Sequence, residues 1–487
     1  MRVLEAACVA AAGADALPAL LSPGAVAVAR GRIVGVDTCE NLRTRFPAAE
    51  RLSLGDAILL PGFVNAHQHG RGLSQIQLGY PDDALEPWIA RRRGRGAPDA
   101  YALTRLAAAQ MVANGVTTTL HANYSYATGD YERELRVAIR AYDEAGMRAT
   151  ICVGYADQGG LVYPQADEDA FRHTLPPAAQ ALLNSARPAY LPLADTLVLM
   201  ARLLEDYGGH PRLTFAYGPA GPQWVSDAAW RALAQDAARR GIGLHFHLLE
   251  SPAQAQAART LYPDGVLAHL EALGVFAAQA SAAHFAQATP ADIKAAARLG
   301  LTIVANPGSN MRLYNGPPAI AAWRAAGLAV AVGTDNCAVD DTEDYLRELR
   351  IGALLARGTE ASGTRSEAVR MLAMGTTAGA QAAFQTGTGR IAPGLKADLV
   401  ALDLARIRGA YLDADADLLD AVMARGCGAD VALTMVDGEV IYRQGEATEA
   451  FGASATARAA RSAGPGTSEA SEAIATALRR HYADRPS

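Results

Sequence analysis

The chain has 487 residues, a formal net charge of −6 and 50% apolar residues, so it can bury a large core and form more than one domain. The weak negative charge, with 19% charged residues, argues against a nucleic-acid-binding protein. No apolar run is long enough to span a bilayer, and the N-terminus lacks the pattern of a signal peptide. We therefore expect a soluble, cytoplasmic protein that does not bind membranes.

Cysteine usage and one basic run are the remaining features of composition. The five cysteines are widely spaced without a CxxC motif, which suits a reducing compartment: Cys8, Cys39, Cys152, Cys337 and Cys427. The basic run "RRRGRG" at 91–96 predicts a solvated loop, with an anion-binding patch as the alternative.

Both ends of the chain carry β patterns. Residues 23–36 alternate apolar and polar side chains around a glycine-containing turn, which predicts a β-hairpin. The segments 396–404 and 431–446 show the same strand pattern. Neither terminal region is long enough for a core of its own, so we expect the two to pair into one small β-sandwich domain.

The middle of the chain alternates between short β-like runs and amphipathic helical stretches such as 102–114, 131–146, 226–240 and 290–299. The β-like runs number eight: 57–69, 116–122, 149–155, 212–217, 243–250, 280–285, 301–305 and 328–335. Eight alternating strands predict an α/β fold that closes as a (β/α)8 TIM barrel. An open doubly wound sheet is the alternative, but no glycine-rich phosphate fingerprint follows the first strand.

These patterns divide the chain into four segments. Residues 1–58 and 385–446 are expected to form the small β domain, and 59–384 the barrel. Residues 447–487 are predicted to be a flexible tail with one short helix at "SEAIATALRRHY". The long stretch 156–194 follows the third strand at its C-terminal end, where loops shape active sites and act as lids.

Imidazoles and carboxylates close four of the predicted strands: His67, His69, His245, His247, Glu250, His284 and Asp335. His67 and His69 are two residues apart, so both side chains project from the same face of a strand. The C-terminal strand ends of a barrel converge on one mouth, and these groups are good ligands for zinc or iron. A single such histidine is usually structural and a single aspartate usually caps a helix, but four strand ends together favour a metal site.

The arrangement resembles the amidohydrolase superfamily, in particular its cytosine deaminase/chlorohydrolase-like (ATZ/TRZ) branch. The similar segments are "PGFVNAHQH", "HFHLLE", "NPGSNMRL", "GTDN" and "GRIAPGLKADLVALD". The resemblance implies one divalent metal, zinc first with iron or manganese as alternatives, on four ligands: His67, His69, His247 and Asp335. It further implies that Glu250 shuttles protons and that His284 orients the attacking water and polarises the substrate. Asp335 would also accept the proton of that water.

Lysine usage supports a single metal. Binuclear members of the superfamily commonly bridge their ions with a carboxylated lysine on a barrel strand, and this chain has only Lys294 and Lys396. Lys294 falls in a predicted helix and Lys396 in the C-terminal β region. His245, two residues before the ligand His247, is either a neighbour of the ligands or simply faces the pocket.

The expected function is that of a hydrolase acting on carbon–nitrogen bonds other than peptide bonds. It would deaminate a small N-heterocycle of the pterin, purine, pyrimidine or triazine type and release ammonia. The alternatives are hydrolysis of an amide, urea or carbamate, removal of chloride from a triazine, and a catalytically silent scaffold. The family also implies a homo-oligomer.

The segment "YGPAGPQW" at 217–224 lacks the histidine that many relatives carry there, which puts thioadenosine- or adenosylhomocysteine-type substrates in doubt. Gln223 could pair with the amide edge of a heterocycle and Trp224 could stack on it, although a turn with a buried tryptophan is an equal alternative. His121 and Tyr124 could line the mouth, with a structural role as the alternative. The candidate substrate contacts are Glu86, Trp88, Gln223, Trp224, Asn310 and Arg312.

Overall fold

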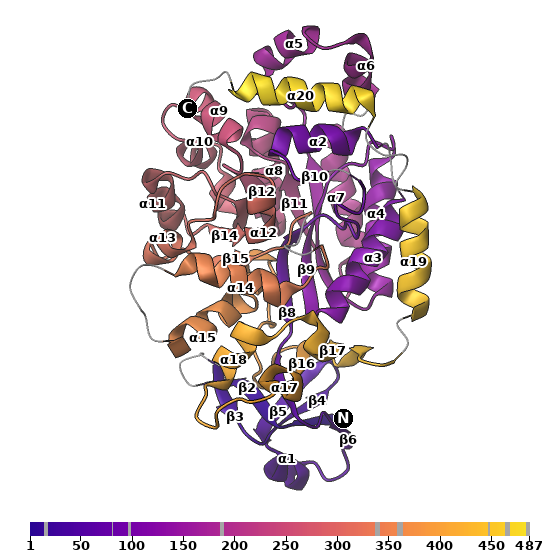
Figure 1. The fold of residues 1–487 in the computed structure, drawn as a ribbon, viewed down its shortest axis with the longest axis vertical. Helices are drawn as coiled ribbons and strands as arrows, with labels where there is room; N and C mark the ends of the chain where they lie inside the picture. Colours follow the sequence, from indigo (N-terminus) through magenta and orange to yellow (C-terminus); the bar gives the residue numbers. More distant parts are fainter. Residues whose placement is uncertain are drawn as a thin grey trace.

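The structure, a computed structural model, describes residues 1–13, 18–79, 81–95, 99–185, 189–336, 341–357, 364–446, 449–462 and 468–483. Cys337, the last residue of the basic run and parts of the 156–194 and 447–487 segments lie outside the described residues. The strands form one eight-stranded sheet and two smaller sheets. Figure 1 shows the smaller sheets at one end of the molecule, beside the N-terminus. Among the described residues, no helix has the length and apolar character needed to cross a membrane.

The two smaller sheets form the expected β-sandwich. One has the order β5-β4-β1-β6, and the predicted hairpin is its antiparallel pair β4–β5. The other has the order β18-β17-β16-β7-β2-β3 and joins strands from both ends of the chain. Apolar side chains of both sheets share one core, including Leu4, Val26, Val9, Leu399 and Met435. The strands are β1 (Arg2–Ala6), β2 (Cys8–Ala12), β3 (Pro18–Leu21), β4 (Gly24–Ala29), β5 (Arg32–Thr38), β6 (Glu50–Ser53), β7 (Ala57–Pro61), β16 (Leu399–Asp403), β17 (Val431–Val436) and β18 (Glu439–Arg443).

The eight predicted barrel strands are confirmed, and neighbours along the sheet are parallel. They are β8 (Phe63–Gln68), β9 (Val116–Asn123), β10 (Arg148–Tyr155), β11 (Leu213–Pro219), β12 (Gly243–Leu248), β13 (Ala280–His284), β14 (Thr302–Ala305) and β15 (Val330–Val332). A bridge between Gln68 and Asp335 joins the two ends of the sheet. There the backbone N–H of Asp335 donates to the carbonyl of His67 at 2.9 Å. This closure excludes the open doubly wound alternative.

The apolar run before His67, expected as one strand, is two strands in different sheets. The chain divides at Gly62, whose N–H donates to the carbonyl of Asp398 at 2.9 Å. A Cβ at Gly62 would lie 2.2 Å from Cγ2 of Thr117, so only glycine fits this close approach. The predicted boundary between residues 58 and 59 therefore falls inside β7, and the four-segment division stays a prediction.

The amphipathic stretches form helices where the sequence predicts them: α3 (Ala100–Ala113), α4 (Tyr131–Glu144), α8 (Asp227–Arg240) and α11 (Pro290–Arg298). Each begins after a side chain that accepts a backbone N–H of its first turn: Asp99, Asp130, Ser226 and Thr289. Ten further helices are α1 (Cys39–Arg45), α9 (Pro252–Leu261), α10 (Val266–Ala272), α12 (Pro307–Arg312), α13 (Ile320–Ala325), α14 (Tyr345–Ala356), α15 (Thr364–Met374), α16 (Thr377–Ala382), α17 (Leu404–Arg408) and α18 (Leu418–Arg425).

The 156–194 segment, expected as a long loop, contains two helices, and a third begins at its end. These are α5 (Gln165–His173), α6 (Pro177–Ser185) and α7 (Leu193–Tyr207). Phe171 and Leu183 of the first two are buried in a small apolar cluster with Leu85 and Trp88. The cluster explains the helices, because each amphipathic face has an apolar partner elsewhere in the chain.

The 447–487 segment also differs from the expected flexible tail. It forms α19 (Glu449–Ser462) and α20 (Glu469–Ala483), where one short helix was expected. Figure 1 shows α20 lying across α2 (Leu85–Arg93), with α5 and α6 beyond it. Ile474 and Leu478 of α20 are buried in the same small cluster as Trp88. Apolar burial against α2 therefore orders this helix.

The basic run at 91–96 is not a solvated loop at its start. Arg91 lies in the last turn of α2 with only 2% of its surface exposed. It pairs with Asp83, and its Nε lies 2.6 Å from Oε1 of Glu472 in α20. Asp83 is eight residues before Arg91, but Glu472 is 381 residues away, and the local sequence does not show that these two carboxylates together allow the guanidinium to be buried.

Candidate metal centre and active site

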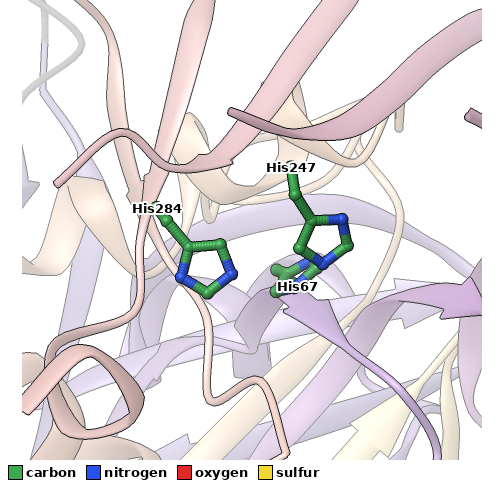
Figure 2. Close-up of side chains that lie close together, drawn as sticks. All are labelled: His67, His247 and His284. Carbon is green, nitrogen blue, oxygen red and sulfur yellow. The ribbon is translucent and has the colours of Figure 1, made fainter. Parts of the chain in front are cut away.

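The predicted metal ligands lie together at the C-terminal ends of β8, β12 and β15. The ligand atoms of His67, His69 and Asp335 lie within 4.8 Å of one another, and so do those of His67, His247 and His284. Figure 2 shows the rings of His67, His247 and His284 gathered side by side. All these side chains are buried, so the cluster sits deep in the barrel mouth.

Hydrogen bonds fix the orientation of the rings. In each, Nδ1 faces a partner outside the cluster: Ala122 O for His69 (2.8 Å), Ala220 O for His247 (2.9 Å), Asn310 Oδ1 for His284 (2.8 Å) and His245 Nε2 for His67 (2.8 Å). A ring that donates from Nδ1 leaves the lone pair of Nε2 directed at the cluster. This is the orientation that a metal-binding imidazole requires.

The protonation states also fit a metal ion. Burial lowers the pKa of His67 to about 3, so its imidazole is neutral at pH 7. Burial acts to raise the pKa of Asp335, but the adjacent rings of His67 and His69 outweigh it and hold that pKa well below its usual value. Oδ1 of Asp335 lies 3.0 Å from Nε2 of His69 and 3.5 Å from Nε2 of His67. Neutral imidazoles and an ionised carboxylate are the forms that bind metals.

Two ring nitrogens show directly that a further group fits here. Nε2 of His67 and Nε2 of His284 are buried and have no hydrogen-bond partner among the described residues. Buried polar nitrogens without a partner are costly, and a metal ion or a water molecule held by it would satisfy them. The donor set of the chain therefore fits a divalent cation.

Glu250 stands beside the cluster, just beyond the end of β12. Its Oε1 lies 3.6 Å from Nε2 of His284 and accepts a hydrogen bond from Nδ2 of Asn315 at 3.2 Å. Burial raises the pKa of the Glu250 carboxyl to about 7. A carboxyl with such a pKa carries a proton about half of the time at neutral pH, so it can both accept and return one.

The backbone around these side chains is unusual. Leu249, His284 and Asp335 have φ angles of 47°, 75° and 54°, in the left-handed region that favours glycine. Each such residue costs on the order of 1–3 kcal/mol, and such residues cluster at functional sites. All three lie where a barrel strand ends: His284 and Asp335 are themselves predicted catalytic residues, and Leu249 directly precedes Glu250.

A cavity of about 260 Å³ opens from the cluster to the surface. His69, His247, Glu250, His284 and Asp335 form its floor. Its walls include Trp88, Tyr124, Tyr190 and Trp224, together with the side chains of Arg92, Arg93 and Arg172. Flat aromatic walls above a polar floor suit a small planar ring system.

Of the six candidate substrate contacts, Trp88 and Trp224 line this cavity. Glu86 and Asn310 are absent from the lining residues. Glu86 accepts a hydrogen bond from Ser251 at 2.6 Å, and Oδ1 of Asn310 lies 2.8 Å from Nδ1 of His284. Arg312 pairs with Asp82 and Asp341. Gln223 is also absent from the lining residues. The structure therefore brings two of the six to the cavity and places four outside it.

Sequence reasoning missed several wall residues. Arg92 and Arg93 belong to the basic run, whose alternative interpretation as an anion-binding patch was the available signal. Tyr190 and Arg172 lie in the 156–194 stretch, and the available signal for them was its position after the third strand, where loops shape active sites. Of the two candidate mouth residues, Tyr124 lines the cavity, whereas His121 is buried and bonds Oδ1 of Asn123 at 2.8 Å.

A closed (β/α)8 barrel with buried imidazoles and carboxylates at its C-terminal mouth defines the chain as a metal-dependent hydrolase. Residues 58–441 match the model of the amidohydrolase family, so the chain belongs to that family. It is a hydrolase that acts on carbon–nitrogen bonds other than peptide bonds.

Two curated relatives align over most of the chain. The 5-methylthioadenosine/S-adenosylhomocysteine deaminase of Nitratidesulfovibrio vulgaris is 29% identical over 455 residues, covering 92% of this chain and 93% of the relative. The 5'-deoxyadenosine deaminase of Methanosarcina barkeri is 28% identical over 431 residues, covering 86% and 88%. Both names describe deamination of an adenine nucleoside.

Solved structures share the fold. An adenosine deaminase from Xanthomonas campestris with bound zinc has a TM-score of 0.78 and 25% identity, covering 94% of this chain and 98% of that one. The atrazine chlorohydrolase TrzN from Arthrobacter aurescens, complexed with zinc, has a TM-score of 0.75 and 20% identity, covering 94% and 100%. The second likeness concerns the fold alone.

Proposed function

We propose that the enzyme is a zinc-dependent aminohydrolase that replaces an exocyclic amino group of a small N-heterocycle by oxygen and releases ammonia. The observation that carries this proposal is the position of Glu250. Its carboxyl, with a pKa raised by burial to about 7, lies 3.6 Å from His284 on the floor of the same cavity as the candidate ligands.

The ligand set that we propose is His67, His69, His247 and Asp335. Three imidazoles and a carboxylate suit zinc, although iron and manganese accept the same donors. The zinc in the Xanthomonas campestris deaminase supports this choice. When bound, a divalent metal lowers the pKa of a coordinated water to about 7.

The residues of this chain would move the protons and hold the water. His284 donates from Nδ1 to Asn310, so its Nε2 can accept a hydrogen bond from the attacking water. Glu250 takes a proton as the water attacks the ring carbon and delivers it to the departing nitrogen. Gln254 and Asn315 hold the Glu250 carboxyl in place through hydrogen bonds of 3.4 and 3.2 Å.

Adenine nucleosides are the first substrates to test, because the curated relatives are named as deaminases of such compounds. The segment 217–224 after β11 contains no histidine, although the family resemblance leads us to expect one there. The carbonyl of Ala220 accepts from Nδ1 of the candidate ligand His247. Base recognition would therefore depend on the walls at Trp88, Tyr124 and Trp224 and on Glu250.

The deciding experiment is a release assay with the zinc-loaded enzyme across aminated and chlorinated heterocycles. Ammonia release from purines, pterins or triazines supports the proposal. Chloride release without ammonia release would assign the chain to chlorohydrolase chemistry. A metal-free, stable protein that turns over none of them would favour a scaffold role. Cytoplasmic location and self-association stay predictions, which fractionation and light scattering can test.

A further inference from the structure

Behind the candidate ligands lies a chain of hydrogen bonds that no step above uses. Nδ1 of His67 lies 2.8 Å from Nε2 of His245, and Nδ1 of His245 lies 2.8 Å from Oγ of Ser281. The hydroxyl of Ser281 donates to the carbonyl of Ala382 at 2.8 Å. None of these four residues is more than 1% exposed, so water cannot replace any of the partners.

The direction of this chain is fixed from its far end. The carbonyl of Ala382 can only accept, so the Ser281 hydroxyl proton points to it and its oxygen accepts from His245. His245 therefore carries its proton on Nδ1 and accepts at Nε2. Because Nε2 of His245 accepts, Nδ1 of His67 must be the protonated donor of this hydrogen bond. Nε2 of His67 then carries no proton, and its lone pair can bind a metal ion.

Among the buried rings of the cluster, His67 is set apart by its partner. Nδ1 of His69 faces the carbonyl of Ala122, which accepts in every protonation state. Nδ1 of His247 faces the carbonyl of Ala220, with the Tyr124 hydroxyl also 3.0 Å away. Nδ1 of His67 faces a second imidazole, which accepts only as the correct tautomer. The orientation of the His67 ring therefore depends on the side chains of His245 and Ser281, and a substitution of His245 can remove the hydrogen bond that fixes it.

We infer that His245 is a positioning residue: by accepting from Nδ1 of His67, it holds His67 Nε2 in the form that binds the metal. Ser281 acts through His245 by setting its tautomer. This inference rests on the proposed metal site but concerns metal affinity, not turnover. Neither residue touches the substrate, since both are absent from the residues that line the cavity.

The test compares zinc affinity by chelator competition for the wild type, His245→Leu and His245→Gln. Leucine keeps the apolar bulk but offers no acceptor, whereas the glutamine carbonyl can accept from His67 and its amide can donate to Ser281. Removing a hydrogen-bond partner of a metal-bound imidazole typically costs roughly 10–100-fold in affinity. We expect a loss of that size for the leucine variant and recovery to within about threefold of wild type for the glutamine variant.

The matched control is His121→Leu. His121 is equally buried on neighbouring β9, but its ring bonds Asn123 and Tyr142 and no candidate ligand. This variant should bind zinc within about twofold of wild type, well inside the change expected at His245. Equal affinities for His245→Leu and wild type, or equal losses for the leucine and glutamine variants at unchanged Tm, would overturn the inference. A wild-type chain that binds no zinc would refute the proposed function instead, so the two failures are distinguishable.

Discussion

Arg148 and Asp398 form a two-point ion pair that fastens the barrel to the small β domain. Nε of Arg148 lies 2.7 Å from Oδ2 of Asp398, and Nη2 lies 3.0 Å from Oδ1. Arg148 begins the barrel strand β10, and Asp398 directly precedes β16 of the sandwich. Their side chains are 0% and 1% exposed. Breaking this pair leaves the buried guanidinium of Arg148 with Asp437 as its remaining carboxylate partner, at 3.2 Å, and that side chain is 27% exposed.

Asp398→Asn should therefore lower the stability of the whole enzyme. Removing one member of a buried pair costs about 3–5 kcal/mol when the remaining charge has no other partner. The ion pair of Arg148 with Asp437 should keep the cost towards the lower end of that range. Thermal unfolding measures the effect as a lower Tm. Glu271→Gln is the control, since its pair with Arg298 is on the surface and its loss should leave Tm unchanged. Equal Tm values for the two variants would contradict the role of the pair.

Glu250→Gln should separate chemistry from metal binding. The amide keeps the size of the side chain but cannot carry a proton between water and leaving group. We expect kcat to fall by about 10²–10⁴-fold, the usual contribution of a general acid–base residue. Zinc content, measured by elemental analysis, should equal that of the wild type. A variant with near-normal kcat would remove Glu250 from the mechanism.

Removal of the metal should lower both activity and stability. An ion that binds only the folded state stabilises it by about 4 kcal/mol at a free concentration 1,000 times Kd. Dialysis against a chelator should therefore lower Tm, and added zinc should restore Tm and turnover together. Asp335→Asn removes the negatively charged ligand, so its Tm should respond much less to zinc. Identical zinc responses in the two proteins would exclude Asp335 as a ligand.

Glu86→Gln should make stability less dependent on pH. Burial raises the pKa of Glu86 to about 7 from the usual 4.5, so its proton stabilises the fold most below pH 4.5. That stabilisation is lost as the pH rises through about 7, because the folded state must then hold a buried charge. The loss amounts to at most about 3 kcal/mol for a shift of this size.

The glutamine variant carries no such charge and can still accept from Ser251. Its Tm relative to wild type should therefore rise between pH 5 and pH 9. Parallel Tm curves over this range would show that Glu86 does not titrate in the folded protein.

Deletion of residues 468–487 should weaken substrate binding. Helix α20 in this segment packs on α2, and α2 carries Trp88, Arg92 and Arg93 of the cavity wall. The hydroxyl of Tyr482 in α20 also donates a hydrogen bond to the carbonyl of Leu161 at 2.7 Å. With the catalytic floor intact, we expect KM to rise by about tenfold or more, the equivalent of roughly 1.4 kcal/mol, with a smaller change in kcat. An unchanged KM would show that the wall residues of α2 keep their positions without α20.

The metal cluster could be predicted because its residues obey local rules. His67 and His69 share one strand face through their spacing, and parallel strands bring their C-terminal ends to one mouth. Once the alternation of strands and helices predicted a barrel, the convergence of His247, His284 and Asp335 followed. The four-ligand set itself came from the family resemblance.

The surroundings of the cluster could not be predicted in the same way. The apolar run divides into strands of two sheets at Gly62, whose backbone N–H donates to the carbonyl of Asp398. No local sequence pattern predicts this hydrogen bond, because Asp398 lies far along the chain. Arg91 was predicted to be solvated because one of its two carboxylate partners, Glu472, lies far along the chain in α20. Glu86 accepts a hydrogen bond from Ser251, and Arg312 pairs with Asp82 and Asp341, so neither side chain lines the cavity.

The sequence by itself determined the barrel, the shared β domain and the identity of the groups at the mouth, because hydrophobic periodicity and strand direction are local properties. Only the tertiary structure decided which side chains line the cavity, which helices cover it and which tautomer each imidazole adopts. The hydrogen bond from Ser281 to Ala382, which fixes the protons on His245 and His67, joins residues 101 positions apart. Such contacts depend on packing between distant segments, which the spacing of residues along the chain does not specify.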